Sequence, residues 1–371
     1  MFGATPSRSV VSVQKSIKRS RHLRILSVTS VRNEGPYLLE WIAHHRAAGV
    51  SDFLVYSNDC DDGTHELLQV LHAAGVVVHV PHEPATDKSI QWQALRAAWK
   101  HPLRKGADWV LVSDVDEFIN IHASGHTIPD LINALPDDAD AIVLPWRLFG
   151  NSEVVGIDAL PVTEQFTRAI PPEAQYPIAA SLFKTLFRAK GPFNQFGVHR
   201  PKQKPKNRAA PPKIYDGSGK LMHSFLAENP QRLSLWQLGV ARDLVELNHY
   251  AVRSAAAFIV KRDRGLPNRA TKQIDLAYWV ERNFNTVEDR SISKMAKATQ
   301  AELKELRRLP DVEAHYAGAL NWHRARFEYL IKHPEYQELM TQILCAGGSD
   351  VPTPQLQKML VRWYQSANKE N

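Results

Sequence analysis

Short apolar runs rich in β-forming residues alternate with segments of helical spacing over residues 25–144, and this rhythm constrains the fold more than any other feature. Strands are expected at 25–31, 52–57, 76–80, 109–113 and 141–144. Helices are expected at 36–48, 65–73, 89–99 and 127–134. Repeated units of this kind build a parallel sheet covered by helices. The sequence therefore predicts an α/β fold with a mostly parallel sheet flanked by helices.

An acidic cluster, Asp-Val-Asp-Glu-Phe at 114–118, directly follows the expected strand at 109–113. In open α/β sheets, ligands bind just beyond the carboxyl ends of parallel strands. In an extended segment Asp114 and Asp116 point to the same side, with Cβ atoms about 6 to 7 Å apart. Oxygen ligands favour Mg²⁺ or Mn²⁺. The cluster therefore predicts a divalent-cation site, although a solvated turn after a strand explains the same residues.

Polar clusters also follow the first two expected strands. The first is followed by Arg-Asn-Glu at 32–34 and the second by Asn-Asp-Cys-Asp at 58–61. Because the sheet brings strand ends together, we expect these clusters to lie beside the acidic one. The carboxylates of Asp59 and Asp61 are candidates to hold a ribose hydroxyl or a base edge. A helix N-cap and an Asx-turn are the plain structural alternatives.

Polar side chains also recur along the helix expected at 89–99. Gln91, Gln93 and Arg96 are candidates to contact a nucleotide or a diphosphate. An exposed polar face, with Trp92 turned to the core, explains the spacing equally well.

The strand–helix rhythm is lost after residue 150. Residues 151–225 are rich in Pro, Gly, Phe and basic residues without a clear period, which favours long functional loops and antiparallel strands. From residue 232 helical patterns dominate, at 275–283, 300–308 and 312–332. The chain of 371 residues exceeds the usual single-core size of about 250 to 300 residues, so an α/β domain with a helical extension is expected.

Composition and charge exclude several classes of protein. No apolar run approaches the roughly 18 residues that cross a bilayer, and Cys60 and Cys345 form neither a disulfide framework nor a thiolate metal site. The formal net charge is +7, and the residues before Glu34 are basic and free of acid. This basic arm is interpreted as a disordered leader, with a transit peptide or binding to anionic lipid, nucleic acid or polyanion as alternatives. The basic stretch 202–213 predicts a surface loop, either over an anionic ligand or simply solvated.

Six motifs, in order, carry a resemblance to a known family. They are Arg-Asn-Glu-Gly-Pro-Tyr-Leu-Leu-Glu-Trp-Ile-Ala-His-His at 32–45, Asn-Asp-Cys-Asp-Asp-Gly-Thr at 58–64, Asp-Val-Asp-Glu-Phe at 114–118, Trp-Arg-Leu-Phe-Gly at 146–150, Asn-His-Tyr-Ala-Val-Arg-Ser at 248–254 and Lys-Arg-Asp-Arg-Gly at 261–265. Together they resemble family-2-type glycosyltransferases of GT-A fold, and more narrowly the branch close to the family-92 galactosyltransferases. The resemblance divides the chain into a basic arm at 1–22, a GT-A domain with a Rossmann-like sheet at 23–270, and a helical extension at 271–371.

The resemblance implies transfer of a sugar from a nucleotide-sugar donor, with a UDP-sugar favoured, Mn²⁺ or Mg²⁺ as cofactor, and inversion at the anomeric carbon. Residues expected to bind the nucleotide sugar are Arg32, Glu34, Asp59, Asp61, Gln91, Arg96, Asp114, Lys261 and Arg264. Residues expected to bind the metal are Asp114, Asp116 and His249, with His199 and His223 as rivals of His249.

The proton acceptor is the least defined part of the expected site. Family-2 enzymes place an acidic pair downstream of the metal motif, and no such pair is evident here. Glu153 is the first candidate, with Glu164 and Glu117 as others, while Trp146 and Phe149 are candidates to stack on the acceptor sugar. By analogy with the family, the acceptor is expected to be a glycan or other hydroxyl compound, and the expected setting is surface polysaccharide synthesis in a bacterial cytoplasm. Association with the inner membrane surface through the basic arm is a further hypothesis.

Two other classes of function also fit the sequence. A metal-dependent phosphohydrolase or nucleotidyltransferase uses carboxylates at strand ends and releases phosphate or pyrophosphate. A non-catalytic polyanion-binding protein would show steep salt dependence and no metal requirement. Nucleic acid is not expected at the acidic cluster, because carboxylates repel phosphate unless a cation intervenes.

Overall fold

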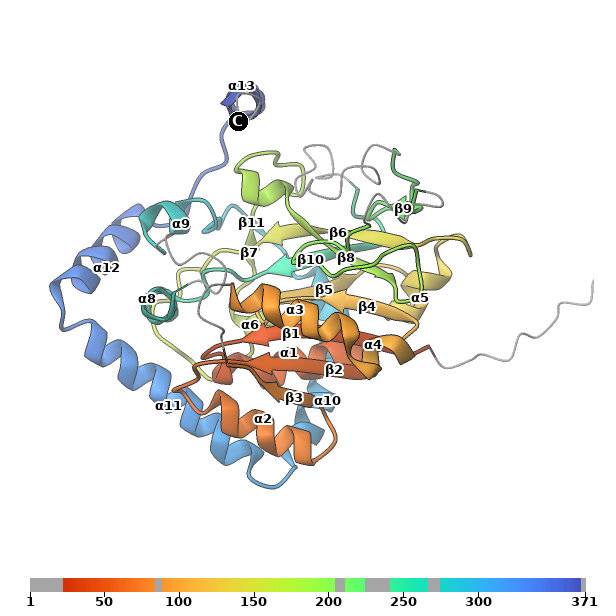
Figure 1. Ribbon diagram of the computed structural model, residues 1–371. Helices are drawn as coiled ribbons and strands as arrows, with labels where there is room; N and C mark the ends of the chain where they lie inside the picture. Colours follow the sequence, from red (N-terminus) through yellow and green to blue (C-terminus); the bar gives the residue numbers. More distant parts are fainter. Residues whose placement is uncertain (1–22, 84–88, 204–210, 224–240, 266–273, 368–371) are drawn as a thin grey trace, which may run out of the picture.

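The computed structural model describes residues 23–83, 89–203, 211–223, 241–265 and 274–367 (Figure 1). The basic arm at 1–22 and most of the 202–213 stretch lie outside these residues. The strands of the main sheet are β1 (Ile25–Val31), β2 (Asp52–Ser57), β3 (Val78–Pro81), β4 (Trp109–Val112), β5 (Glu117–Ile121), β6 (Ala141–Leu148), β8 (Phe183–Arg188), β9 (Ile214–Tyr215) and β10 (Val245–His249), and β7 (Arg168–Ala169) pairs with β11 (Val287–Glu288). The helices are α1 (Gly35–Ala47), α2 (Thr64–Ala73), α3 (Ile90–Lys100), α4 (Pro102–Gly106), α5 (Ile128–Asn133), α6 (Val162–Gln165), α8 (Ala255–Arg264), α9 (Leu276–Val280), α10 (Ala296–Arg307), α11 (Val312–Leu330), α12 (Pro334–Ala346) and α13 (Pro354–Ala367), with short 3₁₀ turns at Ile178–Ser181 and Ser291–Met295.

The main sheet has a parallel half and a mixed half. In the described part of the chain its strand order is β3-β2-β1-β4-β8-β6-β10-β5, with β9 paired to β6. Strands β3, β2, β1 and β4 are parallel, β8 runs antiparallel to β4 and β6, β10 is parallel to β6, and β5 is antiparallel to β10. Because β1 and β4 are parallel neighbours, their carboxyl ends share one edge. The predicted α/β fold, with a mostly parallel sheet and helices on its faces, is confirmed.

Helix α1 shows why the first strand unit folds as predicted. Pro36 stands in its first turn, where a missing N–H costs nothing. Its residues are buried on nearly every side, and Leu38, Trp41 and Ile42 are each 0% exposed. This follows because the sheet covers one face of α1, while α10 and α11 cover the others.

The C-terminal helices are packed on the α/β core. Leu306 and Val312 belong to the same apolar cluster as the residues of β1 and α1. Nε2 of His323 on α11 lies 2.9 Å from Oδ2 of buried Asp62 in the loop before α2. Figure 1 shows α11 and α12 (blue) along one side of the molecule, with α13 beyond them. In the described residues, no helix combines the length and apolar character that crossing a bilayer requires.

Two strands depart from the sequence predictions. The expectation that helical patterns dominate after residue 232 is wrong for β10, a buried strand in the middle of the mixed half. Its residues alternate between apolar and polar, as in a strand with one solvated face. Glu246 and Asn248 are polar but buried, so β10 lacks the continuous apolar run that is typical of a buried strand. Both are buried with polar partners, since Arg242 donates to Glu246 at 3.0 Å and Asn120 donates to Asn248 at 3.3 Å. Strand β5 was also not predicted.

Candidate active site

A polar cavity of about 200 Å³ opens at the shared carboxyl edge of β1 and β4. Its described lining combines three acids, three bases, two histidines and two aromatic residues. These are Glu34, Asp114, Asp116, Arg32, Lys261, Arg264, His199, His249, Trp146 and Tyr278, with Gln91 and Asn58 beside them. This is the edge at which the sequence predicts a site, and it brings together residues from β1 to α9.

A second cavity, of about 520 Å³, lies between α1, α10 and the loop at 158–162. Its carboxylate at Glu40 is already used, because it accepts hydrogen bonds from the Val162 and Thr163 N–H groups at 2.5 and 3.0 Å. Burial raises the pKa of Glu40, and these bonds only partly oppose the shift. The larger cavity is also lined by Asp158, Lys304, Arg307 and Arg308. Its described lining contains no residue from the carboxyl ends of β1 or β4, so we take the strand-edge pocket as the candidate active site.

The acidic cluster forms a turn, so the expectation of an extended segment is wrong. The Glu117 N–H donates to the Asp114 carbonyl at 3.0 Å, and the Asp114 N–H donates to the Glu117 carboxylate at 2.9 Å. The physical reason is topological, since the chain leaves parallel β4 and must enter β5, which is antiparallel to β10. The estimate of Cβ spacing from an extended chain does not apply here.

Asp114 is held by a lysine that no sequence motif marks as a site residue. Nζ of Lys184 on β8 lies 2.9 Å from Oδ2 of Asp114, and Gln91 Nε2 donates to Oδ1 at 3.2 Å. The same ammonium group lies 3.3 Å from Glu117 and donates to the Val198 carbonyl at 3.0 Å. Lys184 is fully buried; burial would lower its pKa, but Asp114 and Glu117 raise it above the ordinary value. The available signal was a single Lys within the apolar run Phe-Lys-Thr-Leu-Phe of a strand.

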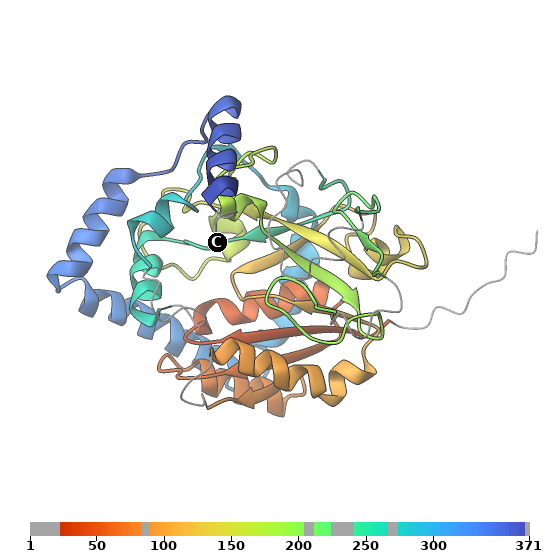
Figure 2. The ribbon, with the colours of Figure 1, turned by 45° about the horizontal axis from the view of Figure 1, so that its top comes forward.

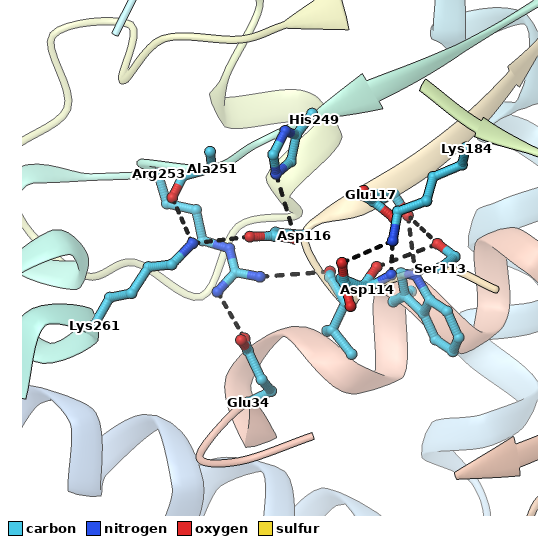
Figure 3. Close-up of polar contacts among 12 residues, drawn as sticks. Glu34, Ser113, Asp114, Asp116, Glu117, Lys184, His249, Ala251, Arg253 and Lys261 are labelled. Carbon is cyan, nitrogen blue, oxygen red and sulfur yellow. Dashed lines mark hydrogen bonds and ion pairs between the residues drawn. The ribbon is translucent and has the colours of Figure 1, made fainter. Parts of the chain in front are cut away.

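Asp116 lies between a lysine and a histidine (Figure 3). Nζ of Lys261 donates to Oδ2 of Asp116 at 2.8 Å and to the Ala251 carbonyl at 2.7 Å. Nε2 of His249 lies 3.6 Å from Oδ1. Burial alone would raise the pKa of Asp116, but the charge of Lys261 and the contact with His249 hold it well below its usual range. Asp116 is therefore an anion at neutral pH, and burial keeps the pKa of His249 below its ordinary value.

Glu34 is fixed by two arginines. Nη1 of Arg253 lies 2.8 Å from Oε2 of Glu34, and Nη1 of Arg264 donates to Oε1 and also to the Arg32 carbonyl at 2.7 Å. Burial would raise the pKa of Glu34, but Arg264 and Arg253 lower it. The guanidinium of Arg253 stacks over the ring of Tyr37, 3.4 Å from the ring centroid. Arg253 stands within the Asn-His-Tyr motif, but its role was not predicted.

Several predicted residues lie in this pocket, and others do not. Those that line it are Arg32, Glu34, Gln91, Asp114, Asp116, His249, Lys261 and Arg264, together with His199 and Trp146. Phe149 is a core residue, 1% exposed, and does not line the pocket. Gln93 does not line the pocket either, and His223 and Arg96 are exposed.

The carboxylates of the cluster after β2, at 58–61, do not face the pocket as the sequence predicts. Asp59 and Asp61 are exposed and do not line the pocket. Asp59 has a positive φ of 45°, and its carboxylate accepts from Asn58 at 3.0 Å. Asp62 is the buried member of the loop, where it binds the Gly35 N–H at 3.1 Å and His323. The geometry thus gives this cluster a structural role at the start of α1.

The expected proton acceptors do not face the pocket. Glu153 is exposed, with a positive φ of 64°, and lies outside the lining. Glu117 is fully buried behind the turn, and burial raises its pKa although Lys184 opposes the shift. Glu164 also lies outside the lining, where it accepts from Gln300 at 2.9 Å. None of the three is therefore positioned to meet an acceptor hydroxyl in this pocket.

A divalent cation fits part of the expected ligand set. Among the described residues, no three His, Cys, Asp or Glu side chains gather as a metal-binding group. Asp116 and His249 are nonetheless neighbours, and Nδ1 of His249 is buried without a hydrogen-bond partner among the described residues. Mg²⁺ in nucleotide sites is typically held by one or two protein ligands plus phosphate oxygens and water. Asp116 and His249 would be sufficient protein ligands for a cation that arrives with a diphosphate. Lys261 binds Oδ2 of Asp116, whereas both carboxylate oxygens of Asp114 are occupied, by Gln91 and by Lys184.

The sequence profile of glycosyltransferase family 92 matches residues 27–224, more than half of the chain. The chain belongs to glycosyltransferase family 92. The match includes the strand ends at 32–34, 58–61 and 114–117 and the buried Lys184. The family resemblance inferred from the sequence is confirmed.

Curated members of family 92 resemble only part of this chain. A family 92 protein of Oryza sativa subsp. japonica is 30% identical over 107 residues, covering 28% of this chain and 17% of the relative. One of Arabidopsis thaliana is 33% identical over 111 residues, covering 29% of this chain and 18% of the relative. The matched segments thus span less than a fifth of the length of these family 92 relatives.

Two solved structures are weakly similar to this chain. The mannosyltransferase of Pyrobaculum calidifontis in complex with GDP-Man and Mn²⁺ has a TM-score of 0.32 and 12% identity, covering 87% of this chain and 84% of that one. Residues 1–349 of TarS from S. aureus have the same TM-score and identity, covering 84% and 92%. The family 92 assignment rests on the sequence profile and not on these likenesses.

Proposed function

We propose that this family 92 protein transfers a hexosyl group from a nucleotide-sugar donor, with a UDP-sugar favoured, to a hydroxyl of a glycan or related acceptor. The observation that carries this proposal is the strand-edge pocket, where anionic Asp116 pairs with Lys261 and lines the same cavity as Arg264. Carboxylates without bases would repel a diphosphate, and bases without carboxylates would hold no cation. A pocket with both suits a cation–diphosphate pair.

Different residues of the pocket would bind different parts of the donor. Lys261, Arg264 and Arg32 supply positive charge for the diphosphate, whose negative charge grows as the sugar departs. Asp116 and His249 would hold Mn²⁺ or Mg²⁺, and a bound cation would supply Lewis-acid stabilisation of the leaving group. Glu34, fixed by Arg253 and Arg264, would accept a hydrogen bond from a polar group of the nucleoside.

His199 is the side chain that we assign as proton acceptor for inverting transfer. Its Nδ1 lies 3.0 Å from the Phe183 carbonyl, so Nδ1 carries the proton and Nε2 keeps its lone pair. Burial lowers the pKa of His199 to about 4, which keeps the ring neutral at pH 7. A neutral imidazole that lines the pocket has the lone pair needed to accept the proton of an acceptor hydroxyl, and the negative charge of a bound diphosphate would raise its pKa toward the neutral range that a general base requires.

The setting that we propose is the one that the sequence suggests, a bacterial cytoplasmic enzyme of surface polysaccharide synthesis. The family analogy carries this part of the proposal.

A donor screen tests the proposed function. UDP-, GDP- and other nucleotide sugars are tested for thermal stabilisation and for donor hydrolysis, with and without Mn²⁺, on the wild type, on Asp116→Ala and on Asp59→Ala as a matched carboxylate outside the pocket. We expect one donor class to stabilise the wild type and Asp59→Ala in a metal-dependent way, and to lose this effect in Asp116→Ala.

The same screen separates the other classes of function. Release of phosphate or pyrophosphate in place of nucleoside diphosphate would replace the transferase proposal with a phosphohydrolase or nucleotidyltransferase. If no nucleotide sugar binds in either metal state, the site assignments fail, and steep salt dependence of polyanion binding would then favour a binding protein.

A further inference from the structure

Helix α13 (Pro354–Ala367) lies at the periphery of the molecule, and its buried residues, Gln357 and Val361, lie on one side of the helix. Figures 1 and 2 show it reached from α12 by an extended connection. Oε1 of Gln357 accepts the N–H groups of Gln175 and Tyr176 at 2.7 and 3.2 Å, and Gln357 and Val361 are the buried residues of the helix. One narrow face therefore attaches α13 to the loop at 175–176.

A second face of α13 presents large apolar side chains to solvent. Leu356 is 46% exposed, Met359 37% and Trp363 60%. Their spacing of three and four residues places them in one stripe along the helix. Contiguous exposed apolar surface of this kind, and an exposed Trp above all, marks an interaction surface.

The charge of α13 is of one sign. The helix carries Lys358 and Arg362 and contains no Asp or Glu. Lys358 adjoins Met359 and Arg362 adjoins Trp363 in the sequence, so each cation lies about 100° around the helix from a member of the stripe. Long basic side chains at the border of an apolar stripe can extend toward phosphate groups while the stripe enters an apolar layer.

We propose that α13 binds the surface of an anionic lipid bilayer. Leu356, Met359 and Trp363 enter the boundary between headgroups and acyl chains, and Lys358 and Arg362 pair with lipid phosphates. A helix with a Trp- and Leu-bearing apolar face and basic polar residues is the type that lies in a membrane interface. This inference is independent of the proposed function and of the basic arm at 1–22.

A second copy of the chain is the less favourable occupant of the same face. In a symmetric pair the same surface of both subunits meets, so Lys358 and Arg362 of one copy would approach the identical cations of the other. Charge complementarity therefore selects the anionic bilayer.

Vesicle co-sedimentation of the full chain tests the proposal. Phosphatidylcholine vesicles with and without phosphatidylglycerol are compared for the wild type, the triple variant L356Q/M359Q/W363Q and the double variant K358Q/R362Q. The control variant Y329Q/L344Q changes two exposed apolar residues, 53% and 49% exposed, on α11 and α12. A variant lacking residues 1–22 separates α13 from the basic arm.

We expect the wild type, the control and the variant lacking 1–22 to bind anionic vesicles, with binding that weakens as salt rises. The triple variant should lose binding, and the double variant should bind roughly 30-fold more weakly. An unchanged melting temperature of the triple variant would verify that the fold is intact.

Three results would overturn the proposal. They are vesicle binding by the triple variant equal to the wild type, loss of binding only when residues 1–22 are removed, and no vesicle binding by the wild type. In the last case, concentration-dependent self-association that disappears in the triple variant would assign the face to a second copy.

Discussion

Nζ of Lys261 lies 2.8 Å from Oδ2 of Asp116, although 145 residues separate the two in the chain. The lysine comes from α8 and the aspartate from the turn between β4 and β5. Their contact places the lysine ammonium group beside the carboxylate that the sequence predicts to bind a metal ion. Asp116 therefore has a built-in positive partner in the absence of any ligand, and its negative charge is maintained inside a buried site.

Substitution Asp116→Asn tests the electrostatic centre of the pocket. We expect kcat/KM for the donor found in the screen to fall roughly 10²- to 10³-fold, because Asn keeps the shape but removes the anion. Asp61→Asn is the matched control, since Asp61 is exposed and outside the pocket, and should retain wild-type kinetics. Steady-state kinetics of both variants decide between the pocket and the predicted role of Asp61. Equal losses in the two variants would show that the pocket is assigned wrongly.

Lys184→Met tests the buried cation beneath Asp114. Removing it leaves two carboxylates without compensation, and the free energy of unfolding should fall by about 3 kcal/mol, at the low end for a buried pair because Asp114 is 35% exposed. Urea unfolding measures the change. Lys213→Met, at an exposed ion pair with Asp138, should have little effect. Adding Glu117→Gln to Lys184→Met should recover part of the loss; no recovery would mean that Glu117 does not depend on this lysine.

His199→Gln tests the proton acceptor. A general base typically contributes 10²- to 10⁴-fold, so kcat for transfer should fall roughly within that range while the Kd of the donor stays near its wild-type value. His223→Gln, at an exposed position outside the pocket, should leave transfer unchanged. Single-turnover transfer and donor titration separate the two effects. If His199→Gln weakens donor binding and transfer equally, the side chain positions the donor and is not the base.

Stability should decrease as the pH falls below neutrality, because α1 buries two neutral histidines. Burial lowers the pKa of His44 to about 4 and that of His45 to about 3. The unfolded chain takes up these protons below pH 6.5 while the folded chain does not, so stability present above pH 6.5 is lost on acidification. Because of His45 alone, the free energy of unfolding should fall by about 2 kcal/mol between pH 6.5 and pH 5.

Thermal and urea unfolding of His45→Phe across this pH range checks the prediction. Below pH 6.5 the free energy of unfolding of the variant should depend less on pH than that of the wild type, whatever its stability at pH 7. His223→Phe, at an exposed site, should keep the wild-type slope. An unaltered slope in His45→Phe would locate the acid sensitivity elsewhere.

The order of residues along the chain is sufficient to define the parallel half of the sheet and the edge on which the site lies. Strands β1, β2 and β4 are short apolar runs that can only be buried, and helices of matching period separate them. Parallel pairing of β1 and β4 then brings Glu34 and Asp114 to one edge, whatever the details of the loops. The local sequence pattern is sufficient to predict these strands and helices, because the burial of apolar residues and their periodicity are properties of each segment alone.

Tertiary structure alone decided which polar residues meet. Lys184 and Lys261 reach Asp114 and Asp116 from strands and helices far along the chain, and no local period encodes such contacts. The turn at Asp114 arises because β5 must run antiparallel to β10, a distant strand. The backbone of the loop after β2, with a positive φ at Asp59, likewise leaves Asp59 exposed to solvent, although its position just after a strand is typical of a binding residue. Charges pair through space, and the sequence records only their order.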